Sequence, residues 1–289
     1  MKVSGFTQAE LDRFRQYQRA SYETLTSVAA SLREGDTEKD VARRVRKRFH
    51  EQGVHHYFHV PVVLFGTRTA YPGNFGQLEA LSTDRKLEPG MPVILDAAPV
   101  YQGYTVDTSL AVPFGDNPRQ RELLAALEPL RELILTRVRE RATFRAIARE
   151  VDEEIRRLGY ENCHKKHIAF VLGHRVTQVP DSWLHRRRIW GLGVEQAAYF
   201  VGKTFSAQKL GGHDSPNWNH TRSSDHPPAP GLWAVEPHLG KDGVGAKFEE
   251  ILVITPDEAY WLDEGALPHH RAWQEMGSGS FIPQRSGLP

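Results

Sequence analysis

Four long segments of the chain carry apolar residues every three to four positions, the spacing of a helix with one buried face. They are residues 7–33, 36–53, 117–139 and 143–158. The first begins with a predicted capping box, because Thr7 is followed three positions later by Glu10. Gly53 ends the second segment and Gly159 follows the fourth, as is typical of helix ends. The pattern therefore predicts two helices near the start of the chain and two near its middle.

Between these helix pairs, residues 92–114 are rich in β-branched and apolar side chains on both sides of Gly103. This pattern predicts two strands joined by a short turn at residues 100–103. Each strand carries one carboxylate, and a loop of two or four residues would place Asp96 directly opposite Asp107. Two facing anions in an apolar strand pair are destabilising unless a cation lies between them. A solvated polar face, or a three-residue loop with a bulge at Gly103, remains an alternative at this point.

Shorter apolar runs at residues 60–65, 168–172, 232–237 and 246–255 predict further strands. One of them ends in Glu236, and another contains Glu249 and Glu250, of which one must face inward by strand alternation. A buried carboxylate is costly unless it is paired or binds a metal, so this is a second indication of a cation. His174 lies just past the strand predicted at 168–172, where sites are often built, although a structural role is the simpler interpretation of one histidine.

Three histidines, His55, His56 and His59, flank the strand predicted at 60–65. Three histidines so close together could be metal ligands. However, their spacing matches no closed zinc site and no cysteines accompany them, so we expect structural roles for them. The segment 180–210 combines tryptophans with three consecutive arginines at 186–188. The chain contains no complete phosphate-binding loop, dinucleotide fingerprint, HExxH or GxSxG motif.

The composition changes this interpretation little. The chain has 289 residues, of which 39% are hydrophobic and 25% charged, as in an ordinary globular protein. Its 37 Lys and Arg balance 36 Asp and Glu, so no net charge recruits nucleic acid or a membrane surface. The single cysteine, Cys163, excludes an internal disulfide, and no signal peptide or run of about 18 apolar residues is present. We therefore expect a cytoplasmic protein with no nucleic-acid or membrane partner.

The succession of Asp96, Asp107, His174, Glu236 and Glu249, each in its local sequence, resembles the pita-bread metallopeptidase family, which includes methionine aminopeptidase, aminopeptidase P and prolidase. The matching patterns are VILDAAPVYQGYTVDTS, the Gly-His at 173–174, AVEP, KFEEILVIT and LEPGMPV. The resemblance covers roughly residues 10–262. It implies an α+β pita-bread fold, with a curved antiparallel sheet and helices packed on its outer face. Residues 1–265 would form one catalytic domain, with an insertion at about 180–210 and a C-terminal tail at 266–289.

The resemblance also implies a site with two divalent metal ions, and its oxygen-rich donors suit manganese, iron, cobalt or zinc. Asp107 and Glu249 would bridge both ions, Asp96 would chelate one, and His174 and Glu236 would bind the other. A metal-bridging hydroxide would attack an N-terminal peptide bond or a related amide bond, with Xaa-Pro peptides as the leading substrates. Glu236 would carry the proton.

Two positions depart from the family pattern. A family histidine in the loop before the hairpin is replaced here by Gly73-Asn74, and His174 is followed by Arg175 instead of glycine. The nearest counterpart of a second family histidine is His213. We therefore expect His213 to act in catalysis and in substrate binding, and Asn74 and Arg175 to contact the substrate.

These departures leave two alternatives to a peptidase. One is an enzyme of the same fold that acts on a non-peptide small metabolite, by hydrolysis or by iron-dependent oxidation. The other is a catalytically inactive binding module, against which the complete ligand set argues. We further expect segment 180–210 to form a lid over the site or a contact in a homodimer.

Overall fold

The computed structural model describes residues 1–73, 77–166, 170–179, 188–189, 192–210 and 215–277. Its helices are α1 (Gln8–Ala29), α2 (Glu38–Glu51), α3 (Gln77–Ala80), α4 (Pro118–Arg139), α5 (Phe144–Arg157), α6 (Val194–Leu210) and α7 (Pro268–Met276), with short 3-10 turns at Gly66–Ala70, Cys163–Lys166 and Arg222–Ser224. Its strands are β1 (His56–Tyr57), β2 (Val62–Phe65), β3 (Pro92–Ala97), β4 (Pro99–Tyr101), β5 (Tyr104–Thr105), β6 (Thr108–Pro113), β7 (Glu161–Asn162), β8 (Gly173–Val176), β9 (Arg188–Ile189), β10 (Leu192–Gly193), β11 (Asn217–Trp218), β12 (Gly231–Val235), β13 (His238–Lys241), β14 (Val244–Lys247), β15 (Glu250–Ile254) and β16 (Ala259–Trp261).

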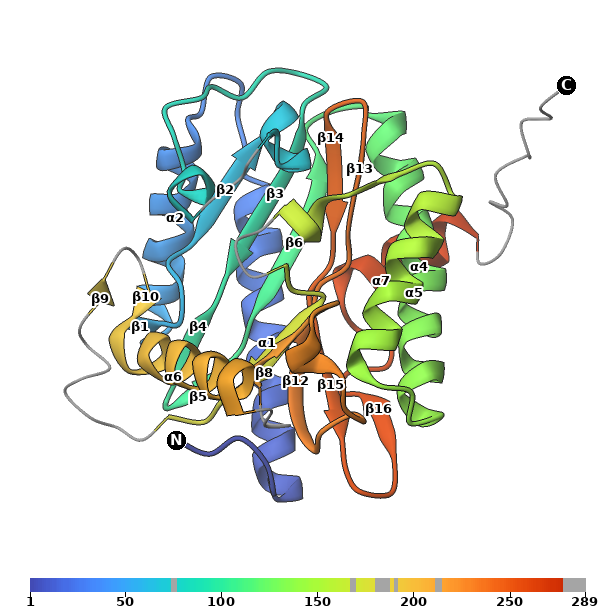
Figure 1. The fold of residues 1–289 in the computed structure, drawn as a ribbon. Coiled ribbons are helices and arrows are strands. Elements are labelled where there is room, and N and C mark those ends of the chain that lie inside the picture. The colour runs from blue at the N-terminus through green and yellow to red at the C-terminus, as the bar shows by residue number, and fades with distance from the viewer. Residues whose placement is uncertain (74–76, 167–169, 180–187, 190–191, 211–214, 278–289) are drawn as a thin grey trace, which may run out of the picture.

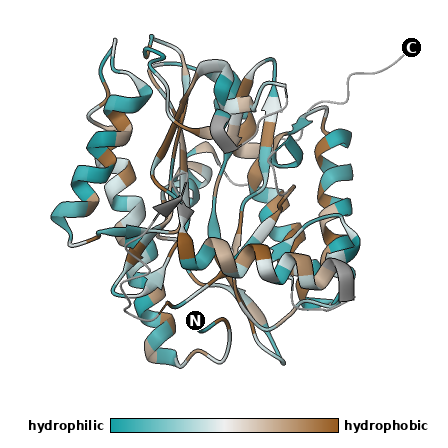
Figure 2. Cartoon of the chain, turned by 60° about the vertical axis from the view of Figure 1, so that its left-hand side comes forward, coloured by the Kyte–Doolittle hydropathy of each residue, from teal (hydrophilic) through white to brown (hydrophobic). Residues whose placement is uncertain are grey.

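The strands form antiparallel sheets between the helices. The largest sheet has the order β11-β8-β12-β15-β16, and three-stranded sheets have the orders β2-β3-β6, β1-β4-β5 and β14-β13-β7. Figure 1 shows the strands between α2 on one side and the α4–α5 pair on the other. Successive residues of β3 pack into different apolar clusters, Ile94 with α4 and α5, and Val93 and Leu95 with α1 and α2. Figure 2 shows the corresponding concentration of hydrophobic residues in the central strands.

The four predicted helices are present. Thr7 and Glu10 form the predicted capping box at the start of α1, which ends at Ala29 rather than near residue 33. Helices α2, α4 and α5 begin after Thr37, Asn117 and Thr143, and each of these residues accepts a hydrogen bond from a backbone N–H in the first turn. None of the helices in the described part of the chain is both long and apolar enough to cross a bilayer.

The central hairpin is present, but its register differs from the expected one. Its turn consists of Gln102 and Gly103, both with positive φ, so the strands pair Tyr101 with Tyr104 and Asp96 with Ser109. This is one residue later than the expected turn at 100–103, and the pairing shifts by two positions. Asp96 and Asp107 therefore share a face diagonally and are not directly opposite each other. Gly103 is required here, because a Cβ atom would lie 2.5 Å from the carbonyl oxygen of Val179.

Three other expectations are corrected in detail. His174 lies inside β8 and not beyond a strand at 168–172, of which residues 168 and 169 lie outside the described part. The strand expected at 246–255 is two strands, β14 and β15, separated by Phe248 and Glu249. Residues 268–276, expected in the tail, form α7, whose Trp273 packs in the core and donates a hydrogen bond to the Leu124 carbonyl oxygen.

Candidate metal centre

Segments that are far apart in the sequence bring four carboxylates and an imidazole together. The five side chains are Asp96 in β3, Asp107 just before β6, His174 in β8, Glu236 just after β12, and Glu249 between β14 and β15. The β8–β12 pairing places His174 opposite Ala234. These two strands approach closely because Gly173 has no side chain, and a Cβ there would lie 2.7 Å from the Ala234 carbonyl oxygen.

His174 faces three of these carboxylates. Its Nε2 lies 3.3 Å from Asp107 Oδ2, 3.3 Å from Glu249 Oε1 and 4.0 Å from Glu236 Oε1. All but Glu236 are buried. The structure thus brings together the residues for which the resemblance implied a role as metal ligands.

His59 also lies in this group, a position that the sequence analysis did not foresee. Its Nε2 lies 3.1 Å from Asp107 Oδ1 and 3.5 Å from Asp96 Oδ1. The position follows from pairing, because His59 comes just before β2, which pairs with β3 and places Val62 opposite Asp96. Local spacing gives no sign of this long-range contact.

The second residue that the sequence analysis missed is Lys247, at the end of β14. Its ammonium group lies 2.9 Å from Asp96 Oδ2, 2.7 Å from Glu236 Oε2 and 3.3 Å from Glu249 Oε2. Its side chain is 2% exposed. A lysine in an apolar strand, two positions before Glu249, is the one signal in the sequence that could have pointed to it.

The positive charge of the side chains in this group does not fully balance the charge of its carboxylates. Burial raises the pKa of Glu249 to about 8, and the neighbouring Asp107 and Glu236 add to the shift against Lys247 and His174. Burial alone would lower the pKa of His59, but the carboxylates of Asp107 and Asp96 outweigh it and raise that pKa to about 10. Burial would raise the pKa of Asp107, and here the two histidines outweigh it, so that this pKa falls below its usual range. The site favours additional cations.

The donors fit divalent metal ions. Two sets of ligand atoms lie within 4.8 Å of one another, His59 with Asp96 and Asp107, and Asp107 with His174 and Glu249. Asp96 Oδ1 is buried and accepts no hydrogen bond from any residue that the structure describes. A buried carboxylate oxygen of this kind is costly unless a cation contacts it. Carboxylate and imidazole donors suit first-row metals such as manganese, iron, cobalt and zinc.

Aromatic rings border the group next to His174. The Phe58 ring lies 5.5 Å from the His174 ring and 4.9 Å from the ring of Phe200 in α6, which is itself 5.8 Å from His174. Gln196 fixes α6 nearby by donating a hydrogen bond to Thr105 Oγ1. The described part of segment 180–210 therefore borders the site, and its role as a lid or dimer contact stays a prediction.

The expected substrate-binding residues have different outcomes. Asn74 and His213 lie outside the described residues, so their roles stay predictions. Arg175 is buried, donates a hydrogen bond to the Pro230 carbonyl oxygen and stacks over Trp233. It follows His174 in β8 and thus points to the other face of that strand, a place that favours packing over substrate contact.

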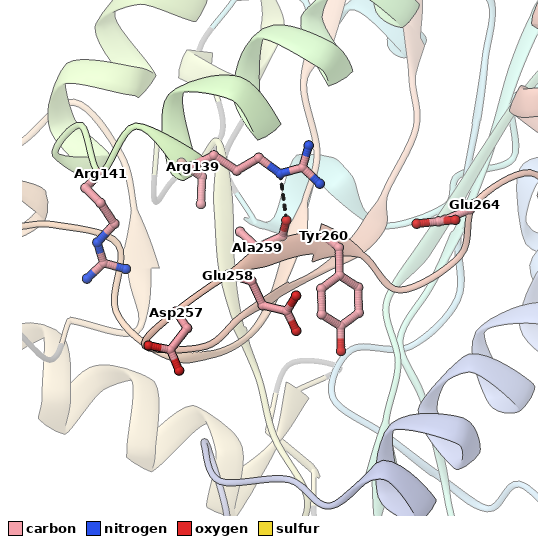
Figure 3. Close-up of a pocket in the computed structure, with 8 residues that line it drawn as sticks. Arg139, Arg141, Asp257, Glu258, Ala259, Tyr260 and Glu264 are labelled. Atoms are coloured by element: carbon pink, nitrogen blue, oxygen red, sulfur yellow. Dashed lines mark hydrogen bonds between the residues drawn. The ribbon is translucent and has the colours of Figure 1, made fainter.

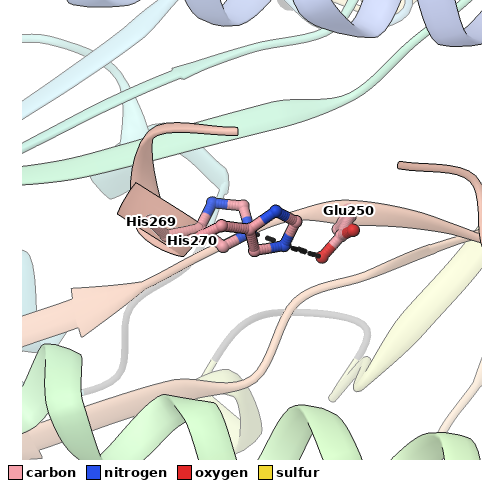
Figure 4. A group of neighbouring side chains, drawn as sticks. All are labelled: Glu250, His269 and His270. Atoms are coloured by element: carbon pink, nitrogen blue, oxygen red, sulfur yellow. Dashed lines mark hydrogen bonds and ion pairs between the residues drawn. The ribbon is translucent and has the colours of Figure 1, made fainter. Parts of the chain in front are cut away.

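A second group of metal-ligating residue types lies elsewhere. Glu250 Oε2 is 3.3 Å from His269 Nε2 and 3.3 Å from His270 Nε2, and Figure 4 shows both imidazoles directed at it. However, the Arg131 guanidinium binds both oxygens of Glu250, at 2.7 and 2.8 Å. Because this cation already neutralises the carboxylate, we interpret the cluster as a buried ion pair. The expectation that one of Glu249 and Glu250 faces inward is corrected, since both are buried on different sides.

The pocket in Figure 3 is separate from the carboxylate group. It has a volume of about 530 Å³ and is lined by Val138, Arg139, Arg141, Asp257, Glu258, Ala259, Tyr260 and Glu264. Arg139 Nε donates a hydrogen bond to the Ala259 carbonyl oxygen across it. None of the clustered carboxylates or histidines lines this pocket.

The fold resembles those of several solved peptidase structures. An X-Pro aminopeptidase from Thermotoga maritima is 18% identical with a TM-score of 0.60, and the match covers 91% of this chain and 62% of that one. A prolidase from Pyrococcus horikoshii is 16% identical with a TM-score of 0.62, and the match covers 91% of this chain and 64% of that one. An Xaa-Pro dipeptidase from Bacillus anthracis is 17% identical with a TM-score of 0.60, and the match covers 90% of this chain and 61% of that one. The chain therefore spans less than two thirds of the length of these structures. At this identity the likeness establishes the α+β pita-bread fold.

The family follows from the sequence as a whole. No curated protein matches the chain at a significant level. The sequence profile of metallopeptidase family M24, however, matches residues 12–256, which include His59, His174 and the four carboxylates grouped with them. The chain belongs to metallopeptidase family M24.

Proposed function

We propose that this protein is a metal-dependent hydrolase that cleaves an N-terminal peptide bond or a related amide bond, with Xaa-Pro peptides as the leading substrates. The observation that carries the proposal is the pair of donor sets that share Asp107, one on each of its carboxylate oxygens. Membership of the family supports a peptidase, and the resemblance in fold to an X-Pro aminopeptidase and an Xaa-Pro dipeptidase supports the Xaa-Pro preference.

We propose two divalent ions at adjacent positions, as the two donor sets suggest. When bound, such ions polarise a carbonyl group and lower the pKa of water towards neutral. Asp107 would hold both positions, because its Oδ1 faces His59 and its Oδ2 faces His174. Glu249 Oε1 and Glu236 Oε1 would complete the position beside His174.

Glu236 is suited to move the proton. Its side chain is 17% exposed, against 11% for Asp96 and 2% for Asp107 and Glu249, so it is the carboxylate most open to a substrate. The Lys247 ammonium holds its Oε2 at 2.7 Å, which orients the carboxylate so that it would accept a proton and return it to the leaving amine.

The aromatic border suggests how a substrate is oriented. Phe58 and Phe200 present apolar surface beside His174, which suits a proline ring or another apolar side chain next to the scissile bond. His213 and Asn74 remain the proposed polar contacts to the substrate, whereas the burial of Arg175 against Trp233 favours a packing role for that residue.

The test is a panel of Xaa-Pro and Met-Xaa peptides, incubated with protein that has been stripped of metal and reloaded with manganese. We expect hydrolysis of at least one peptide class by the wild type. Glu236→Gln should lower kcat at least a hundredfold, because the proton carrier is lost while the shape is retained. Glu258→Gln, an exposed residue of the separate pocket, is the matched control and should hydrolyse peptides at the wild-type rate. If the metal-loaded wild type hydrolyses none of these peptides, the proposal of a peptidase is rejected and a non-peptide metabolite is favoured as the substrate.

A further inference from the structure

We propose that His59 is a ligand of the metal centre, and that it binds one divalent ion together with Asp96 and Asp107. The buried Lys247 ammonium takes the contact that Glu249 would otherwise make with this ion. The inference rests on the metal centre of the proposed function and is independent of which substrate is cleaved.

The orientation of His59 matches that of the expected ligand His174. His59 Nδ1 lies 3.0 Å from the carbonyl oxygen of the next residue, Val60, and His174 Nδ1 lies 3.3 Å from that of Arg175. In both rings this contact assigns the proton of the neutral imidazole to Nδ1 and leaves the Nε2 lone pair facing the carboxylates. Metal-ligating histidines are commonly held in this way, with the other ring nitrogen donating to a carbonyl group.

The atoms around His59 have the spacing of a ligand set. Its Nε2 lies 3.1 Å from Asp107 Oδ1 and 3.5 Å from Asp96 Oδ1. Donors bound to one tetrahedral ion at about 2.0–2.2 Å lie roughly 3.2–3.6 Å apart, so one ion can reach all three atoms. Asp96 Oδ1 accepts no hydrogen bond within the described residues, and such an ion would satisfy it.

Lys247 explains why a further ligand is needed. Its ammonium binds Asp96 Oδ2 and Glu249 Oε2, while Glu249 Oε1 faces His174. Each Glu249 oxygen thus already contacts a cationic or imidazole group, whereas the family resemblance implied that this carboxylate bridges both ions. His59 fills the vacated place with a neutral donor, which also keeps the site from gaining another negative charge.

The alternative role for His59 is that of a permanently protonated partner of Asp107. A ligand and a cation respond differently to replacement by a carboxylate. Glutamate can bind a metal in place of imidazole, but it cannot replace a positive charge beside Asp107.

The experiment is a calorimetric titration of Co²⁺ into metal-stripped protein, with the visible absorption of bound Co²⁺ recorded in parallel. The variants are His59→Ala and His59→Glu, and the matched control is His55→Ala, an exposed histidine of the same segment. Wild type and the control should bind two Co²⁺ per chain. His59→Ala should lose one binding step or weaken it at least tenfold, and His59→Glu should recover part of that loss.

Circular dichroism of each metal-stripped variant shows that the fold is retained. Binding by His59→Ala that equals the His55→Ala control would overturn the inference. So would a loss in His59→Ala that His59→Glu does not reduce, because that result identifies a cation role. If the wild type takes up no Co²⁺, the proposed function fails together with this inference. If the wild type binds Co²⁺ and only the His59 variants contradict the expectation, this inference fails alone.

Discussion

Asp107 holds the central place among the individual side chains of the site. Its two carboxylate oxygens face different histidines, Oδ1 toward His59 and Oδ2 toward His174. Asp96, by contrast, lies beside His59 and Lys247. Loss of Asp107 therefore affects both proposed ion positions, and loss of Asp96 affects one.

We predict that Asp107→Ala loses nearly all bound metal, whereas Asp96→Ala keeps the ion at the His174 position. Elemental analysis of the two variants, each dialysed against the same manganese buffer, measures the difference. Equal metal content in both variants would contradict the assignment of Asp107 as the shared ligand.

The Lys247 ammonium contacts three carboxylates of the site, and its removal takes one positive charge away from all three. We predict that Lys247→Met lowers the free energy of unfolding of the metal-free protein by about 3 kcal/mol, as is typical when one partner of a buried ion pair is lost. Manganese should restore more stability to this variant than to the wild type, because the ion replaces the missing charge.

Lys241→Met is the control for this prediction, since Lys241 is a partly exposed lysine of the adjacent strand β13 and pairs with Glu122. Urea unfolding with and without manganese measures both variants. An effect of Lys247→Met no larger than that of Lys241→Met would argue against a role for the buried ammonium.

Among the elements, β15 is bound on its far side by α4 and α7. Glu250, at the start of β15, accepts hydrogen bonds from Arg131 of α4 and from His269 and His270 of α7. Burial alone would raise the pKa of Glu250, but these three donors outweigh it and hold that pKa well below its usual range. The cluster thus connects α7 to α4 and β15.

This contact predicts loss of stability in mild acid. Burial lowers the pKa of His269 to about 4, despite the opposing effect of Glu250. Below pH 6.5 the unfolded chain binds a proton at this histidine and the folded chain does not, so stability falls as the pH drops from 6.5 towards 4. Glu250 acts in the same direction below about pH 4.5, where its unfolded form becomes protonated.

We expect the wild type to lose about 2 kcal/mol more than His269→Gln between pH 7.5 and pH 5.0. Urea unfolding at the two pH values measures the difference. Parallel losses in the two proteins would show that His269 does not titrate as its burial indicates.

Helix α6 is the element we expect to contact the substrate. Phe200→Ala removes the ring beside Phe58 and His174, and we predict that KM for a cleaved peptide rises roughly tenfold, because part of a buried phenyl contact is lost. Phe205→Ala, on the same helix and 57% exposed, is the control and should leave KM unchanged. Steady-state kinetics measures KM for both variants. Equal KM values would show that α6 does not contact the substrate.

At the scale of the whole molecule, the sequence was sufficient for what local patterns encode. The capping box of Thr7 and Glu10, the helices before and after the hairpin, and the family itself could all be predicted from it. The register of the hairpin could not, because it depends on a positive φ at Gln102. The places of His59 and Lys247 depend on long-range strand pairing, which no short window of sequence contains.

The cytoplasmic location and the homodimer stay predictions at this scale, as does the lid role of segment 180–210. The account depends instead on the folding of β3, β6, β8, β12 and the β14–β15 junction into one metal-binding centre. Diffraction at a manganese-sensitive wavelength, from crystals grown with Mn²⁺, locates bound ions without reference to activity.

The account predicts two anomalous peaks on either side of the Asp107 carboxylate, one contacted by His59 and the other by His174. Manganese-loaded crystals with no peak among these residues, or with the ion at Glu250, His269 and His270 instead, would contradict it.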